Sequence, residues 1–144
     1  MTPEDREALR AQLVEHEGLK LSAYFDHLGF WTIGVGRLID ARRGGGITKS
    51  EAMILLDNDI DLCVADLSVA PWWAGLDAVR QRAVIDMRFQ LGATGFRKFT
   101  KMLAALDAGD PVEAARLARL SKWAREDTPA RAARVTAMLE TGDA

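Results

Sequence analysis

The sequence predicts an α+β fold that is mostly helical, with one small β element near the N-terminus. Three observations favour this class. Helix start and stop signals frame the chain before residue 18, short runs rich in glycine and aromatic residues fill residues 19–39, and apolar residues recur at helical spacing from residue 48 onward. With 144 residues, of which 49% are hydrophobic and 28% charged, the chain is able to bury one sizeable core or two small lobes.

The first helix is predicted over residues 3–17. Thr2 supplies a capping hydroxyl, Pro3 fits the first helical turn, and acidic residues follow at the positive end of the helix dipole. Gly18 suits the residue of positive φ that often closes a helix. Glu17 is therefore expected in the last turn, near the negative end of the dipole, where a carboxylate resists ionisation.

Residues 19–39 are predicted to form two strands joined by a turn at residues 27–29, which makes one hairpin. Gly34 and Gly36 allow close approach of a ligand or of another backbone, and they are equally consistent with a β-bulge. The basic, glycine-rich segment 39–46 is interpreted as a linker, with contact to anionic groups as the alternative.

The remainder of the chain is predicted to be helical. Thr48 and Glu51 form a capping box that opens a long connecting helix over residues 48–70. Four further helices are predicted from apolar spacing and from proline and glycine signals: one from Leu76 to Leu91 stopped by Gly92, one from Phe96 to Leu106 stopped by Gly109, a short one opened by Asp110 and Pro111, and one opened by Thr128 and Pro129 and stopped by Gly142.

Several classes of protein are excluded by composition. No apolar run approaches the ~20 residues of a membrane span, and the charged N-terminus is not typical of a secretory signal, so a soluble cytosolic product is expected. The single Cys63 has apolar neighbours and is predicted to be a buried, inert thiol. A calcium loop that began at Asp57 would need glycine at its sixth position and glutamate at its twelfth, where this chain has Leu62 and Ser68, so neither a metal site nor a cofactor is predicted.

Three polar residues near the predicted hairpin are candidates for catalysis. Glu17 ends the first helix, Asp26 lies beside the turn, and Thr32 lies in the second strand, so the three are able to face one cleft. Hydrolysis of a glycoside needs such a division between a protonated acid and an ionised carboxylate that activates water or attacks the sugar. The alternative interpretation is that both acids are solvated surface residues.

Four blocks carry a resemblance to a known family, in its order and over most of the chain: EHEGLKLSAYFDHLGFWTIGVGR (15–37), ITKSEA with DNDID (47–61), LDAVRQRAVIDMRFQLGATG (76–95), and SKW with TPARAARV (121–135). With these blocks the chain resembles the phage-type lysozymes of glycoside hydrolase family 24, the muramidases or endolysins typified by T-even coliphages. The resemblance implies a lysozyme-like fold in which residues 1–144 form one domain, with a β-containing lobe (18–47), a connecting helix (48–70) and a helical lobe (1–17 plus 71–144).

The resemblance also implies roles for individual residues. Glu17 matches the general acid, Asp26 the second carboxylate, and Thr32 the residue that holds the attacking water with Asp26, with inversion expected at the sugar. Leu38, Phe89 and Gln90 match positions that line the saccharide groove. Arg131 matches an arginine that pairs with the catalytic glutamate.

The chain departs from the family pattern at several positions. Arg37 stands where the family usually has histidine and is expected to pair with Asp59 in the following helix. The loop after Arg37 is shorter, and Met102 and Leu117 replace two groove residues. The shorter loop implies a smaller N-terminal lobe, and substrate affinity is the property that it is expected to change.

The function implied is a monomeric muramidase that cleaves the β-1,4 bond of peptidoglycan glycan strands and reaches the wall after a separate hole-forming protein releases it from the host cytoplasm. A non-catalytic wall-binding module is the alternative. Residues 76–144 carry twelve Lys/Arg against nine Asp/Glu, which makes a nucleic-acid binder a third and weaker possibility, and no nucleic-acid partner is predicted.

Overall fold

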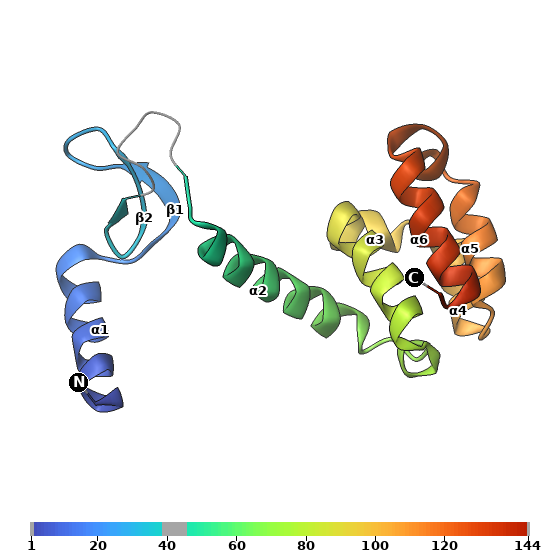
Figure 1. The fold of residues 1–144 in the computed structure, drawn as a ribbon, viewed down its shortest axis with the longest axis horizontal. Helices are drawn as coiled ribbons and strands as arrows, with labels where there is room; N and C mark the ends of the chain where they lie inside the picture. Colours follow the sequence, from blue (N-terminus) through green and yellow to red (C-terminus); the bar gives the residue numbers. More distant parts are fainter. Residues whose placement is uncertain (1, 39–45, 144) are drawn as a thin grey trace. The chain divides into compact units, whose positions relative to one another are not determined.

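The computed structural model describes residues 2–38 and 46–143 of the chain (Figure 1). Internal contacts divide it into two compact units, Met1–Ile54 and Leu55–Ala144, and each is described by itself. The first unit holds a helix and a small sheet, and the second is helical. This content confirms the predicted α+β, mostly helical class. The grouping of residues 1–17 with the C-terminal helices stays a prediction.

Helix α1 spans Pro3–Glu17, the predicted bounds. Thr2 Oγ1 accepts a hydrogen bond from the Asp5 N–H at 3.1 Å, and the Asp5 carboxylate accepts one from the Thr2 N–H at 3.0 Å. This reciprocal capping box satisfies two N–H groups that a helix start leaves unpaired. Gly18 ends the helix at φ 75°, as predicted, but its ψ of 162° leads the chain directly into an extended strand instead of a left-handed turn.

The sheet of the first unit is antiparallel and has the order β1-β2-β3. Strands β1 (Lys20–Phe25) and β2 (Trp31–Gly34) form the predicted hairpin, with Tyr24 opposite Thr32. A third strand, β3 (Arg37–Leu38), pairs with β2 and was not predicted, because two residues are too short to show an alternating pattern. The predicted linker 39–46 lies outside the described residues, apart from Gly46.

Helix α2 spans Lys49–Leu67 and continues from the first unit into the second. The Glu51 carboxylate accepts from the Thr48 N–H at 2.9 Å, and the Glu51 N–H donates to Thr48 Oγ1, which confirms the predicted capping box. Cys63 is buried on this helix, also as predicted. Burial raises the pKa of the Cys63 thiol, so the thiol stays protonated at neutral pH.

The second unit consists of helices joined by short turns. Their bounds are η1 (Trp73–Gly75, a 3₁₀ turn), α3 (Ala78–Arg97), α4 (Thr100–Asp107), α5 (Pro111–Arg119), η2 (Trp123–Asp127, a π-helical turn) and α6 (Pro129–Thr141). The predicted stop at Gly92 is seen as a break inside α3, where Gly92 adopts φ 68° and ψ 168°. The start of α5 at Asp110 and the end of α6 at Gly142 agree with the predictions.

The prediction of one continuous helix through residues 96–106 is wrong. Phe96 lies in the last turn of α3, and the chain leaves the helix at Phe99, where ψ is 51°, before α4 begins. The apolar residues keep helical spacing across this break, and no glycine or proline lies between Phe96 and Thr100, so the break was not predictable from local pattern. The break lets Phe99 pack edge-on against Trp123, with ring centroids 6.0 Å apart.

The core of the second unit is filled by side chains of two kinds. Large residues such as Met87, Met102 and Leu139 are almost fully buried. Alanines fill the helix contacts, since α5 packs against α4 and α6, and α6 packs against α3. The alanines with almost no exposed surface are Ala83, Ala114, Ala115, Ala118 and Ala132. Small side chains allow the helix backbones to approach closely.

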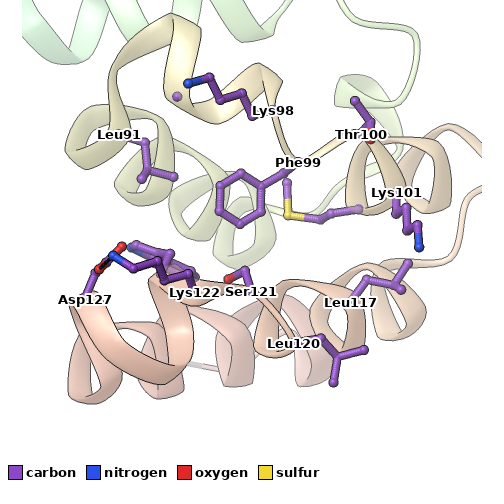
Figure 2. Close-up of a pocket in the computed structure, with 13 residues that line it drawn as sticks. Leu91, Lys98, Phe99, Thr100, Lys101, Leu117, Leu120, Ser121, Lys122 and Asp127 are labelled. Carbon is purple, nitrogen blue, oxygen red and sulfur yellow. Dashed lines mark hydrogen bonds and ion pairs between the residues drawn. The ribbon is translucent and has the colours of Figure 1, made fainter.

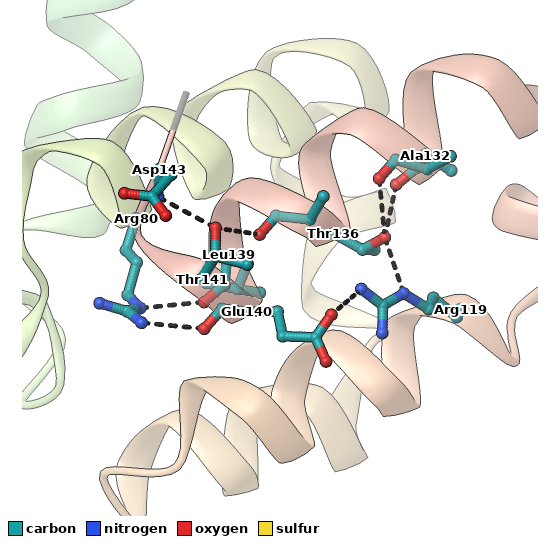
Figure 3. Close-up of polar contacts among 10 residues, drawn as sticks. Arg80, Arg119, Ala132, Thr136, Leu139, Glu140, Thr141 and Asp143 are labelled. Carbon is teal, nitrogen blue, oxygen red and sulfur yellow. Dashed lines mark hydrogen bonds and ion pairs between the residues drawn. The ribbon is translucent and has the colours of Figure 1, made fainter.

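Polar contacts join α6 to α3 and α5 (Figure 3). Arg80, in the first turn of α3, donates through Nε to the Leu139 carbonyl oxygen at 3.0 Å and through Nη2 to the Glu140 carbonyl oxygen at 2.9 Å. Arg119 of α5 donates to Thr136 Oγ1 at 3.1 Å and forms an ion pair with the Glu140 carboxylate. Among the described residues, no buried side-chain nitrogen or oxygen atom lacks a hydrogen-bond partner.

Candidate active site

One hollow of the first unit collects the candidate catalytic residues. It has a volume of about 580 Å³, and its lining includes Glu17, Asp26, Thr32 and Leu38. Glu17 comes from the end of α1, Asp26 from the turn after β1, Thr32 from β2 and Leu38 from β3. The fold of this unit therefore brings together four of the five candidates that the sequence placed between residues 17 and 38, and the fifth, Arg37, is not among the residues that line the hollow.

Glu17 reaches the hollow because α1 ends there. Gly18 donates its N–H to the Val14 carbonyl oxygen at 2.9 Å, which closes the last turn and leaves the Glu17 side chain exposed. Gly36 lies directly against this side chain. A Cβ atom built on Gly36 would stand 2.8 Å from Glu17 Oε2.

Asp26 is held by the turn that follows it. Its Oδ1 accepts hydrogen bonds from the Leu28 N–H at 2.9 Å and from the Phe30 N–H at 2.8 Å. This arrangement is an Asx turn, in which a short carboxylate satisfies the N–H groups of the loop. Since both bonds go to Oδ1, Oδ2 is the atom that remains available, with no partner among the described residues.

Thr32 lies in the central strand, with Tyr24 on one side and Leu38 on the other. Its residue surface is only 4% exposed, and its Oγ1 donates to the Phe30 carbonyl oxygen at 3.2 Å. A hydroxyl has two lone pairs besides its proton, so Thr32 Oγ1 keeps the capacity to accept a hydrogen bond from a water in the hollow.

Several residues of the hollow were not singled out from the sequence as candidates, and Lys20 and Tyr24 are two of them. The Lys20 ammonium lies 4.1 Å from the centroid of the Tyr24 ring, in cation–π contact, and both residues line the hollow. They stand four residues apart on β1, and the pairing register of β1 with β2 shifts between them, so simple alternation along the strand does not determine their common face. This irregularity is not visible in the sequence, which explains why the two residues were not identified from it.

Arg37 has a partner other than the one predicted. Its Nη2 lies 2.5 Å from Glu51 Oε1, and the arginine side chain is 60% exposed. A backbone hydrogen bond from Thr48 is the main cause that lowers the pKa of Glu51, and the charge of Arg37 adds to it. Asp59 belongs to the second unit, and its pairing with Arg37 stays a prediction.

The other candidates lie in the second unit. Gln90 donates through Nε2 to Thr128 Oγ1 at 3.2 Å and accepts from Trp123 Nε1 at 3.0 Å, while Phe89 is 42% exposed. Arg131 donates through Nε to Asp86 Oδ1 at 2.7 Å. The expected pairing of Arg131 with Glu17 is an untested prediction.

The second unit has a larger hollow, of about 610 Å³, shown in Figure 2. Met102 and Leu117, the two changed groove residues, line it together with Phe99 and Trp123. The carboxylate in its lining is Asp127, which lies 2.7 Å from Lys122 Nζ. Because this hollow lacks a pair of carboxylates, the acid and base of a hydrolase are better matched by the hollow of the first unit.

Two absences hold for the part of the chain that the structure describes. No three His, Cys, Asp or Glu side chains gather there in a group able to hold a metal ion. No helix in the same ranges has the length and apolar character needed to cross a membrane.

Comparison with known proteins identifies the family. The phage lysozyme family profile matches residues 14–138. The chain is 28% identical over 162 positions to the probable T4-type lysozyme 1 of Dictyostelium discoideum, covering 94% of this chain and 95% of that protein. It is 32% identical over 110 positions to the endolysin of Acyrthosiphon pisum secondary endosymbiont phage 1, covering 76% of this chain and 73% of that protein.

A third relative is much longer than this chain. The pre-baseplate central spike protein Gp5 of Enterobacteria phage T4 is 33% identical over 162 positions, which cover 94% of this chain but 28% of the spike protein. The matches define a peptidoglycan-hydrolysing glycoside hydrolase of the lysozyme type. The chain belongs to the phage lysozyme family.

Proposed function

We propose that the chain hydrolyses the β-1,4 bond between N-acetylmuramic acid and N-acetylglucosamine, with inversion at the anomeric carbon. The observation that supports this proposal is the hollow of the first unit, where Glu17, Asp26 and Thr32 meet. One acid, one anchored carboxylate and one hydroxyl are the groups that such a hydrolysis requires.

Each of the three side chains has one task in the reaction. Glu17, in its protonated form, donates its proton to the glycosidic oxygen as the bond from that oxygen to the anomeric carbon breaks. A water on the opposite face of the sugar forms the new bond to the anomeric carbon and transfers a proton to Asp26. Proton exchange with solvent then restores both carboxyl groups, so the reaction consumes one water and no cofactor.

The arrangement of Asp26 and Thr32 supports their pairing on one water. The turn fixes Oδ1 of Asp26 through two N–H donors and leaves Oδ2 to act as the base. Thr32 Oγ1 donates to a backbone carbonyl, so it would hold the water as an acceptor. An inverting enzyme places its carboxyl groups roughly 6.5–9.5 Å apart to leave room for that water.

The remaining assignments extend the proposal along the substrate. Leu38, Phe89 and Gln90 contact the glycan strand, and Arg131 pairs with Glu17. The enzyme acts as a monomer. It is made in the host cytoplasm and reaches the wall through pores formed by a separate protein.

The decisive experiment replaces the proton donor. Glu17→Gln keeps the size of the side chain but has no proton to give, so lysis of Gram-negative cells stripped of their outer membrane should fall by about 10²- to 10⁴-fold. Glu15→Gln is the matched control, because Glu15 lies on the same helix, is exposed and does not line the hollow. The control should lyse cells at the parental rate.

Other outcomes discriminate between the classes of protein. A folded Glu17→Gln variant that lyses cells at the parental rate would rule out the role of Glu17. A parental chain that pellets with walls without releasing reducing ends would be a wall-binding module. A salt-dependent shift of DNA without lysis would identify a nucleic-acid binder. Inversion is tested separately, by the anomer that NMR detects in freshly formed product.

A further inference from the structure

The turn between β2 and β3 places a glycine against the proposed proton donor. Antiparallel pairing of Ile33 with Arg37 leaves Val35 and Gly36 as the turn, and Gly34 is the last residue of β2 before it. Both glycines have positive φ, 68° for Gly34 and 62° for Gly36, a conformation that side chains with a Cβ rarely adopt. Backbone conformation therefore explains a glycine at either position.

The surroundings of the two glycines differ. A Cβ atom on Gly34 would meet nothing within 4 Å. A Cβ atom on Gly36 would stand 2.8 Å from Oε2, 3.2 Å from Cδ and 3.3 Å from Cβ of Glu17. Gly36 also lines the hollow that contains Asp26 and Thr32. The absence of a side chain at position 36 thus leaves the space that the Glu17 carboxyl group occupies.

We propose that Gly36 is a positioning residue, which sets where the Glu17 carboxyl group points by leaving its flank empty. This inference rests on the proposed role of Glu17 as proton donor. The Cβ of Glu17 is fixed by the last turn of α1, whereas its carboxyl end turns about single bonds. An added methyl group at position 36 is therefore relieved most easily by rotation of the carboxyl group away from its place.

A methyl group at position 36 is expected to lower the rate of the chemical step through its contact with Glu17. A general acid has to stand within hydrogen-bond reach of the oxygen that it protonates, and a displacement of about 1 Å is able to cost ~10²-fold in rate. Substrate contacts elsewhere in the hollow do not depend on that rotation. Gly36→Ala should therefore lower kcat by about 10- to 100-fold and change KM little.

Gly34→Ala is the matched control, because it imposes the same backbone strain without touching Glu17. Both variants should lose similar amounts of thermal stability, and Gly34→Ala should keep the parental kcat at temperatures where it is folded. The measurement is reducing-end release from soluble peptidoglycan fragments, with kcat and KM determined separately. If Gly36→Ala does not fold, Gly36→Asn and Gly34→Asn replace the pair, since asparagine tolerates positive φ better.

A double-mutant cycle separates positioning from general damage. If Gly36 acts through Glu17, then Gly36→Ala should cost no further activity once Glu17→Gln has removed the acid. Two results would overturn the inference and leave the proposed function intact. One is that Gly36→Ala has the same kcat as Gly34→Ala. The other is that Gly36→Ala lowers kcat by the same factor in the Glu17→Gln background as in the parental chain. Parental activity of Glu17→Gln alone would instead overturn the proposed function and, with it, this role of Gly36.

Discussion

Replacement of Arg80 is expected to lower the free energy of unfolding much more than replacement of an arginine that forms only an exposed ion pair. Its guanidinium donates to two carbonyl oxygens at the C-terminal end of α6 and also pairs with Asp77, three residues earlier. Those carbonyls lack helical partners and lie at the negative end of the dipole, so a cation satisfies them in two ways. The Arg80 side chain is 22% exposed, which limits solvent screening of these bonds.

The magnitude follows from these contacts. A hydrogen bond to a charged group contributes about 1.5–3 kcal/mol, but the carbonyls regain water when the arginine is removed, so Arg80→Met should cost about 2–3 kcal/mol in all. Arg116→Met is the control, since Arg116 has an i,i+3 pair with Glu113 and both side chains are exposed. The loss of that solvent-exposed pair should cost much less than the loss of Arg80.

The assay is equilibrium unfolding of the full chain in urea, followed by far-UV circular dichroism. Hydrogen exchange adds a local readout, because the amides of the last turn of α6 should lose protection in Arg80→Met alone. If the two variants lose equal stability, the carbonyl contacts of Arg80 contribute nothing beyond a surface ion pair. That result would refute the reasoning.

Three other predictions concern the site and its surroundings. Thr32→Glu places a carboxylate where the attacking water is proposed, and mass spectrometry should then detect a covalent glycosyl adduct; unmodified protein with full activity would exclude Thr32 from the site. The hydrogen bond from Arg88 lowers the pKa of Asp66 below its ordinary value of 3.8, so this contribution to stability is present above pH 3.8 and lost as the pH falls further; Asp66→Asn should flatten that loss in acid unfolding curves. Arg37→Met should cost only about 0.2–1 kcal/mol because the arginine is mostly exposed, and a much larger loss of stability would favour an additional partner such as the predicted Asp59.

Much of the fold was predictable where local chemistry decides the structure. The bounds of α1 follow from Thr2, Pro3 and Gly18, and the start of α2 follows from the pairing of Thr48 with Glu51. These signals act within four residues, so tertiary packing did not need to be known. The predictions failed where packing overrides the local pattern, as at Phe99, which leaves its helix to meet Trp123.

The candidate site also has a part that local sequence predicts and a part that depends on tertiary packing. Residues 17–38 are close in sequence, and one helix end and two turns bring Glu17, Asp26 and Thr32 to a single hollow. The partner of Arg37 was not predictable by the same means. Arg37 and Glu51 are separated by fourteen positions and belong to different elements, so their pairing depends on tertiary structure. The role of Gly36 was equally hidden, since the sequence shows that a glycine is present but not which side chain occupies the space beside it.

The alanines between α3, α5 and α6 have a consequence for how the second unit tolerates change. At Ala83, Ala115 or Ala132, every substitution other than glycine adds atoms at a site that has no exposed surface, at a cost of about 1–3 kcal/mol for each overpacked site. Met87 and Met102 are buried too, but they are flexible, and exchange for another large apolar residue costs less than about 1.5 kcal/mol. The distances between these helices are thus fixed by the smallest side chains, while the largest ones remain exchangeable. Diversification of this unit can proceed by replacing its bulky residues while the helix framework keeps its dimensions.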